Sequence, residues 1–342
     1  MNRGMLESVF RRILVEMKDS PERSTRRLVD LGVDFCKGRF RDEFLLSAQA
    51  ALENPNSAYY RLVQDTVFHV DTDKLLTFCF NIGYNGFGVG AETIRKIEKK
   101  EGYDIPWCLT FEVNDKRIAN YSSVISDGEK LGIHLWILHT EDLSDSLFEM
   151  IKAHKESSFI LCTSPTSLSL ENVTVADDIN NLMITVKYAE GETDEEKMSE
   201  GCRLLRENGL LYSVYTPYTE KDVDTILSDD LITQVESYHP VMFFLSPDYK
   251  CPMSVRHRVF SYVNRTRKKQ IHKTILWDTY HDTNHIDSII SDNCCQAAFN
   301  KVGALVSYQK KKIYTEYNLF EQKLCDILRA AFPKPVTIDG NI

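Results

Sequence analysis

The sequence predicts an α/β protein: a partial or open (β/α) barrel of the TIM type with about six to seven parallel strands, preceded by an α-helical N-terminal region. The first hundred residues carry apolar side chains at helical spacing. From Ile105 onwards, short apolar runs alternate with amphipathic segments, an order typical of parallel strands joined by helices. The length of 342 residues suits one large domain or a domain with an appendage.

The N-terminal region, residues 1–103, is predicted to be helical. The first helix has an apolar face formed by Met5, Val9, Ile13 and Met17. Further amphipathic stretches cover residues 28–35, 44–52, 59–67 and 91–101. The glycine-rich run Gly83–Gly90 (GYNGFGVG) loosely resembles a phosphate-binding turn. It follows a helical region and not a strand, so we expect a structural turn.

The central region, residues 104–296, is predicted to form the barrel. Its expected strands are Trp107–Val113, His134–Leu138, Phe159–Cys162, Met183–Lys187, Leu211–Tyr215, Met242–Leu245 and Thr274–Trp277. Helices are expected near Ser122–Leu131, Ser144–His154, Asp194–Asn208, Glu220–Leu227 and Ser254–Lys268. Right-handed crossovers through these helices make all the strands parallel. No pattern marks a clean eighth strand–helix unit.

The C-terminal region, residues 297–342, contains two predicted elements and a tail. Ala297–Tyr308 reads as a hairpin that turns at Asn300–Gly303. Residues 313–331 are expected to form a final helix, and the residues from Pro333 onwards a loose tail.

Charge and hydropathy exclude several classes of partner. The chain has 41 Lys and Arg against 50 Asp and Glu, a net charge of −9, whereas nucleic acids and anionic membranes favour a basic surface. No apolar run approaches the roughly 18 residues of a membrane-spanning helix. Arg11, Arg12 and Glu16 interrupt the N-terminal segment, so it is not a signal peptide. We therefore expect a cytoplasmic protein that binds neither nucleic acid nor membrane.

The cysteine spacing supplies no local metal or cluster motif. The nine cysteines lie at positions 36, 79, 108, 162, 202, 251, 294, 295 and 325. Only Cys294 and Cys295 are close together, and no CxxC or CxxxC is present. We expect mostly reduced, buried thiols.

Several stretches along the chain carry a family resemblance. They are Ala58–Val70 (AYYRLVQDTVFHV), Gly102–Trp107 (GYDIPW), Ser126–Ile133 (SDGEKLGI), Asn208–Leu211 and Ser228–Ile232 (SDDLI). Over almost its whole length the chain resembles bacterial radical S-adenosylmethionine (SAM) proteins with a helical N-terminal extension. This resemblance implies a partial barrel in which a CxxxCxxC loop after the first strand holds a [4Fe–4S] cluster. The fourth iron of that cluster binds SAM.

The chain departs from that family at four strand ends. Residues 113–120 (VNDKRIAN), which replace the cluster loop, contain no cysteine. The family's Gly-Gly-Glu motif reads His139-Thr140-Glu141 here, and its Thr-Asn-Gly motif reads Thr163-Ser164-Pro165. Lys187 ends the fourth strand, where the family prefers an acidic residue. The resemblance therefore implies a dismantled active site, and we expect neither a cluster nor SAM as a cofactor.

The leading hypothesis is a catalytically degenerate radical SAM-like protein that acts as a binding, partner or regulatory module. A protein partner, a second copy of the chain or a small molecule in the barrel would be its ligand. The alternative is an enzyme, with a pocket rebuilt around Glu141, Asp278, His281 and Asp282. A non-standard cluster that uses SAM would instead draw on Cys108, Cys294 and Cys295. A third hypothesis is a structural or regulatory role for the N-terminal helices as an oligomerisation surface.

Candidate site residues follow from the rule that function collects at the C-terminal ends of barrel strands. The predicted vestigial pocket comprises Glu112, His139, Glu141, Thr163, Lys187, Tyr215, Asp278 and Asp282. Asn114, Asp248 and His281 are expected at the same edge. The simpler alternative is that these side chains fill the emptied barrel with salt bridges and hydrogen bonds.

No metal is expected, and the nearest approach to a ligand set is in one short segment. It contains Asp278, His281, Asp282 and His285. His281 and His285 would share a face if this segment is helical.

Overall fold

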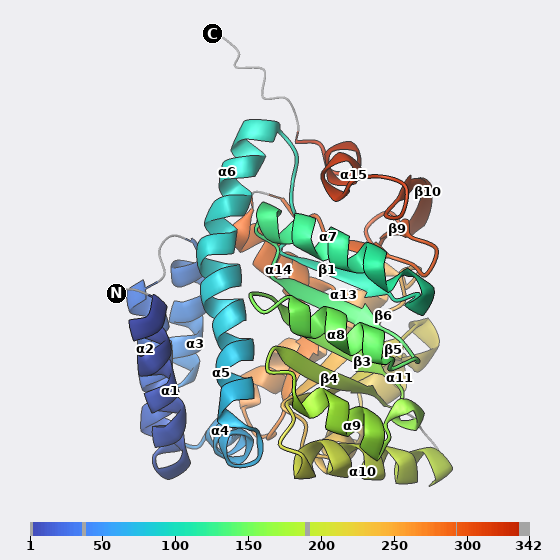
Figure 1. Cartoon of the computed structure of the whole chain (residues 1–342). Helices are drawn as coiled ribbons and strands as arrows, with labels where there is room; N and C mark the ends of the chain where they lie inside the picture. Colours follow the sequence, from blue (N-terminus) through green and yellow to red (C-terminus); the bar gives the residue numbers. More distant parts are fainter. Residues whose placement is uncertain (1–2, 36–38, 189–191, 292, 335–342) are drawn as a thin grey trace.

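The computed structural model describes residues 3–35, 39–188, 192–291 and 293–334. Its centre is a 10-stranded sheet in the order β10-β9-β8-β1-β2-β3-β4-β5-β6-β7, which curls into an open barrel (Figure 1). The predicted fold class is confirmed: strands alternate with helices, a helical region precedes them, and the barrel does not close. No helix among the described residues is long and apolar enough to cross a membrane.

The barrel strands lie side by side in chain order and are all parallel. They are β1 (Cys108–Glu112), β2 (Leu135–His139), β3 (Ser158–Thr163), β4 (Leu182–Lys187), β5 (Tyr212–Tyr218), β6 (Met242–Pro247) and β7 (Ile275–Asp278). All seven predicted strands are confirmed to within a few residues. Their near-continuous apolar runs are explained by burial on both faces of the sheet.

Helices between the strands cover the convex face of the sheet (Figure 1). They are α7 (Ile118–Leu131), α8 (Asp145–Ala153), α9 (Leu170–Asp177), α10 (Glu192–Glu207), α11 (Val223–Ile226), α12 (Asp229–Glu236), α13 (Met253–Lys269) and α14 (His281–Ile290). Ser144, Ser169 and Ser228 begin α8, α9 and α12, and each accepts a backbone N–H bond of the first turn.

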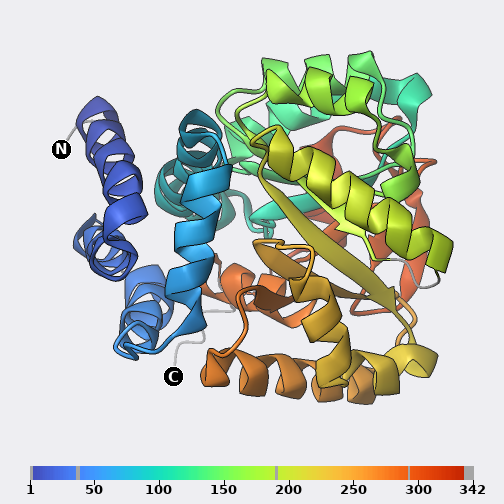
Figure 2. The ribbon, with the colours of Figure 1, turned by 90° about the horizontal axis from the view of Figure 1, so that it is seen from below.

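The N-terminal helices pack against the N-terminal ends of the barrel strands. They are α1 (Arg3–Asp19), α2 (Pro21–Phe35), η1 (Phe40–Leu45), α3 (Leu46–Ala51), α4 (Ala58–His69), α5 (Thr72–Phe80), η2 (Asn81–Gly90) and α6 (Ala91–Glu101). Figure 2 shows them along one side of the barrel. Ser158, which begins β3, donates a 2.8 Å hydrogen bond to the Phe78 carbonyl of α5.

The prediction of a turn at Gly83–Gly90 is wrong, because this segment is a π-helix, η2, that joins α5 to α6 without a break. Two asparagines of η2 explain the difference. The Asn81 amide donates to the carbonyls of Lys155 and Ser157, at 2.9 and 3.0 Å, and the Asn85 amide donates to the Glu156 carbonyl at 2.8 Å. These bonds fix the wide turns of η2 against the loop before β3.

The C-terminal region extends the sheet beyond β1. The predicted hairpin is confirmed as β8 (Ala297–Phe299) and β9 (Ala304–Ser307), and β8 pairs with β1 as an eighth parallel strand. The predicted helix over residues 313–331 is wrong in its first half. That half forms β10 (Lys312–Asn318) on β9, and only α15 (Leu324–Ala331) is helical. Alternating β-branched and aromatic residues in KIYTEYN favour a strand. Of the predicted tail, residues 335–342 lie outside the described residues.

Candidate binding cavity in the barrel

A cavity of about 350 Å³ lies between the concave face of the sheet and the N-terminal helices. Alternate residues of each strand face it because successive side chains of a strand point to opposite sides. The strand residues that line it include Cys108, Thr110, Leu135, Ile137, His139, Ile160, Cys162, Met183, Thr185, Tyr215, Met242, Phe244, Ser246 and Trp277. Its volume falls at the small end of the range, roughly 300–1,000 Å³, of small-molecule sites.

The N-terminal helices close the cavity with apolar side chains. Phe44 of η1, Leu75 and Phe78 of α5, and Ile82 and Phe87 of η2 all line it. The sequence did not indicate this role, because these residues are far from the strands along the chain.

An aromatic cluster extends this closure to the start of the barrel. The rings of Phe40 and Phe87 lie 4.4 Å apart between centroids, and those of Phe87 and Trp107 lie 5.4 Å apart. Phe87 and Trp107 line the cavity, so one end of it is walled by rings.

His139 and Tyr215 form a contact near the C-terminal ends of β2 and β5. Their rings meet edge to face with centroids 5.6 Å apart. Burial lowers the pKa of His139 to about 4; the Glu141 carboxylate opposes this shift, and the Lys187 ammonium adds to it. The His139 ring is therefore neutral at physiological pH.

The other titratable groups that line the cavity are also held neutral. Burial raises the thiol pKa of Cys108 and Cys162 well above the usual range of a cysteine. Burial likewise raises the pKa of Tyr308 to about 12 and that of Tyr215 further. None of these groups carries a charge at neutral pH, so the cavity is apolar and uncharged.

The predicted pocket residues are only partly brought together. His139, Glu141, Lys187 and Tyr215 lie near one another, since Glu141 shifts the pKa of both His139 and Tyr215, and Lys187 shifts that of His139. Glu112 and Glu141 are exposed at the rim. Thr163 is fully buried and follows Cys162, so its side chain lies on the other face of β3, away from the cavity.

Two further residues predicted at this edge, Asn114 and Asp248, accept hydrogen bonds from nearby backbone N–H groups. Asn114 caps η3 (Asp115–Arg117) by accepting the Lys116 N–H bond. Asp248 accepts the Lys250 N–H bond at 2.8 Å and is exposed.

Asp278 and Asp282 belong to a separate, buried cluster. The Asp278 carboxylate accepts the backbone N–H bonds of Tyr280 and His281, and it lies 3.1 Å from the ring Nδ1 of His281. Asp282 forms a bidentate pair with Arg267, at 3.1 and 3.0 Å, and also accepts the backbone N–H of Asp278. These carboxylates are therefore occupied by internal partners.

The four residues considered as metal ligands do not converge. The segment after Asp278 is indeed helical, as α14, but His285 is exposed whereas Asp278 and Asp282 are buried. Within the described ranges, no group of three or more His, Cys, Asp or Glu side chains is arranged to hold a metal ion.

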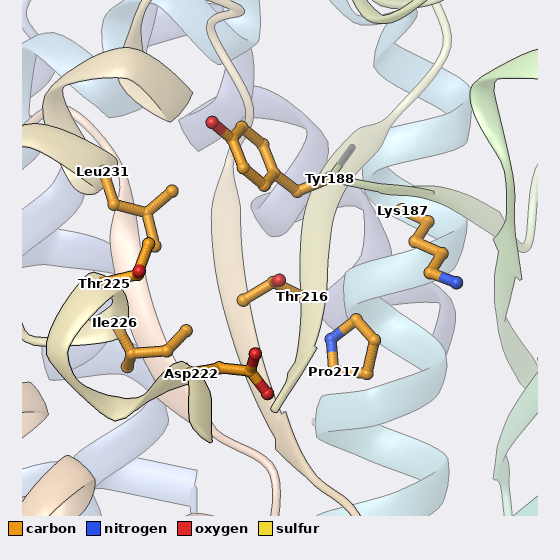
Figure 3. A pocket seen from close by; sticks show the side chains of 8 residues that line it. All are labelled: Lys187, Tyr188, Thr216, Pro217, Asp222, Thr225, Ile226 and Leu231. Atoms are coloured by element: carbon orange, nitrogen blue, oxygen red, sulfur yellow. The ribbon is translucent and has the colours of Figure 1, made fainter. Parts of the chain in front are cut away.

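A smaller pocket of about 220 Å³ lies beside the ends of β4 and β5 (Figure 3). It is lined by Lys187, Tyr188, Thr216, Pro217, Asp222, Thr225, Ile226 and Leu231. Asp222 already accepts the backbone N–H and the hydroxyl of Thr219, as part of a capping box. The Lys187 side chain points away from Ile226 and Leu231 in Figure 3. Five of its eight lining residues, Lys187, Tyr188, Thr216, Asp222 and Thr225, carry polar side-chain groups.

The cysteines considered for a non-standard cluster lie far from the usual cluster position. Cys108 begins β1, at the opposite end from the loop 113–120. Cys108 and Cys295 are both buried near Asp287, and burial together with that carboxylate raises the pKa of both thiols well above their usual range. Protonated thiols are poor iron ligands, so this arrangement does not favour a cluster.

Comparisons with known proteins show a likeness of fold. No protein-family model matches the chain, and no curated protein matches its sequence. A crystal structure of SuiB from Streptococcus suis bound to precursor peptide SuiA matches with a TM-score of 0.51 at 10% identity. The match covers 68% of this chain and 66% of SuiB, slightly less than two thirds of that chain. Another SuiB structure, bound to S-adenosylmethionine, gives a TM-score of 0.48 at 10% identity, with the same coverage.

Proposed function

We propose that this chain is a catalytically degenerate radical SAM-like protein whose barrel binds an uncharged, mainly apolar small molecule. The barrel cavity, with its neutral lining, is the observation that carries the proposal. The sequence resemblance to the radical SAM family and the fold similarity to SuiB support the part of the proposal that calls the chain radical SAM-like.

The residues present do not fit an iron–sulfur cluster. Three thiolates are needed where β1 ends, and residues 113–120 contain no cysteine. Cys108 and Cys162, which line the cavity, are held protonated by burial.

The residues present do not fit SAM either. SAM carries an ammonium, a carboxylate and a sulfonium group, and each of these charges needs a partner when it leaves water. The cavity offers a neutral imidazole, neutral phenols and neutral thiols instead. Bulky side chains also stand at His139-Thr140-Glu141, where the family brings glycine backbone close to SAM.

Calorimetric titration of the purified chain tests this proposal. The neutral probe 4-propylanisole is expected to bind with one site per chain, whereas SAM is expected to give no heat of binding. The variant Ile137→Trp places a ring in the cavity and is expected to abolish probe binding, and Leu170→Trp, at a 62% exposed position, is the matched control. Saturable binding of SAM would contradict the proposal. Equal affinity of 4-propylanisole for the Ile137→Trp variant and for the unaltered chain would also contradict it.

A further inference from the structure

The cavity contains buried polar atoms without partners. The Thr185 side chain is fully buried, and its Oγ1 has no hydrogen-bond partner among the described residues. Gln296 donates its Nε2 to the Thr279 carbonyl at 3.3 Å, but its buried Oε1 accepts no bond from any described residue. Because an unpaired buried acceptor costs roughly 1–3 kcal/mol, these atoms indicate a ligand that supplies the missing donor.

Neutral donors also line the cavity. His139, Tyr215 and Tyr308 line the cavity, and within the part of the chain that the structure describes their imidazole and phenol groups form no hydrogen bond. A phenol or a neutral imidazole can both donate and accept one bond. Gln296 Oε1 can only accept, so the complementary ligand group must at least donate.

The N-terminal helices line the cavity mainly with apolar and aromatic side chains, and Thr66 and Cys79 are their polar contributions among the described residues. Phe44, Phe78 and Phe87 line it from these helices, and Phe87 contacts Trp107; Phe244 and Trp277 add two further rings from the strands. Aromatic walls favour a flat ring through edge-to-face and offset contacts. The N-terminal helices therefore contribute mainly rings and apolar groups to the cavity, whereas its unpaired polar groups belong to the strands and to the segments next to β8 and β9.

From this polarity we infer that the ligand is an uncharged phenol with an apolar substituent. Its hydroxyl group donates to Gln296 Oε1 and accepts from His139 or a neighbouring tyrosine, and its ring and substituent lie among the aromatic side chains. A carboxylate or an amine would bring an unpaired charge into a neutral wall. The inference rests on the proposed function, because it assumes that the barrel binds a small molecule.

A pair of probes that differ by one methyl group tests the inference. Calorimetry compares 4-propylphenol with 4-propylanisole, which lacks the donor hydrogen but keeps the ring and the chain. The unaltered protein is expected to bind the phenol roughly five- to tenfold more tightly, the worth of one net hydrogen bond. Equal affinities would overturn the phenol inference and leave the proposed function intact, whereas no binding of either probe would contradict both.

The variant Gln296→Met tests whether Gln296 Oε1 accepts the hydrogen bond from the phenol hydroxyl group. Met keeps the approximate length of the side chain but removes the amide oxygen, so the phenol is expected to lose its roughly five- to tenfold advantage while the anisole affinity changes by less than about twofold. Tyr314→Phe, outside the cavity, is the matched control and is expected to keep the preference. A Gln296→Met variant that retains the preference would overturn the assigned contact, and the probe comparison on the unaltered chain does not depend on whether this variant folds.

Discussion

At the scale of single residues, the cavity is defined by groups that are kept neutral. His139 faces the cavity although a carboxylate and an ammonium act on it from the rim, and burial outweighs the carboxylate. Burial also favours the neutral form of Asp287, which accepts the backbone N–H bonds of Trp107 and Cys295. Its pKa is therefore raised to about 8. Both groups make folding stability depend on pH, with opposite signs.

His139 predicts a loss of stability in acid. Its pKa is about 4 in the folded chain against 6.5 in the unfolded chain, so the unfolded chain binds more protons between these values. Above pH 6.5 His139 is neutral in both states and does not lower the free energy of unfolding. As pH falls from 6.5 to about 4, protonation of the unfolded chain lowers the free energy of unfolding by up to about 3 kcal/mol.

Denaturant unfolding of the unaltered chain and of His139→Leu between pH 4 and pH 7 measures this contribution. Only the difference between the two proteins is used, because Asp287 contributes equally to both and favours the folded state at low pH. The variant is expected to gain relative stability as pH falls, and a difference that does not change with pH would show that folding does not lower the pKa of His139.

At the scale of elements, the π-helix η2 holds the N-terminal helices against the barrel. At Gly90, where η2 ends, a Cβ atom would collide with the carbonyl oxygens of Gly132 and Asn85. Gly132 itself has φ +98°, a conformation that favours glycine. At Gly83 a Cβ atom would meet open space. The glycine-rich composition is thus needed for close packing at one end of η2.

These two glycines form a matched pair for mutation. Gly90→Ala is expected to destabilise the chain by about 2–3 kcal/mol, because backbone must move to admit the methyl group. Gly83→Ala is expected to stabilise it by up to about 1 kcal/mol, because alanine favours a helix. Thermal or denaturant unfolding measures both, and equal effects at the two positions would contradict the assigned contact of Gly90 with Gly132.

The elements show how far the sequence alone could predict this structure. The strands were predictable because each is a short apolar run between amphipathic helices, a local signal. The glycine-rich π-helix and β10 were not, since η2 is fixed by Asn81 and Asn85 bonds to distant carbonyls, and β10 by pairing with β9. Tertiary contacts override local propensity in η2, whereas in β10 the pairing with β9 agrees with the strand propensity of its residues.

The cavity was predictable only in part, for the same reason. His139 and Tyr215 follow from the rule of strand ends, and period-two alternation extends it to Ile137 and Leu135. Nothing in the sequence links Cys79 or Gln296 to this wall, because they reach it from a helix and from the segment before β8.

At the scale of the whole molecule, an open barrel is closed by elements that lie outside its strand–helix repeat. The N-terminal helices cover one end, and the hairpin β8–β9 extends the sheet beside β1 and brings Tyr308 to the cavity (Figure 1). The enclosed space is neutral and ring-lined, whereas iron–sulfur chemistry with SAM requires thiolates and charged partners. An open barrel whose fold is similar to that of SuiB thus encloses a neutral, mainly apolar cavity.

The most direct test is the iron and acid-labile sulfide content per chain after anaerobic reconstitution. The absence of cysteine from residues 113–120 and the protonated state of the buried thiols predict a content near zero. About four irons and four sulfides per chain would show that distant cysteines assemble a [4Fe–4S] cluster, and would contradict the account of a barrel without its cluster.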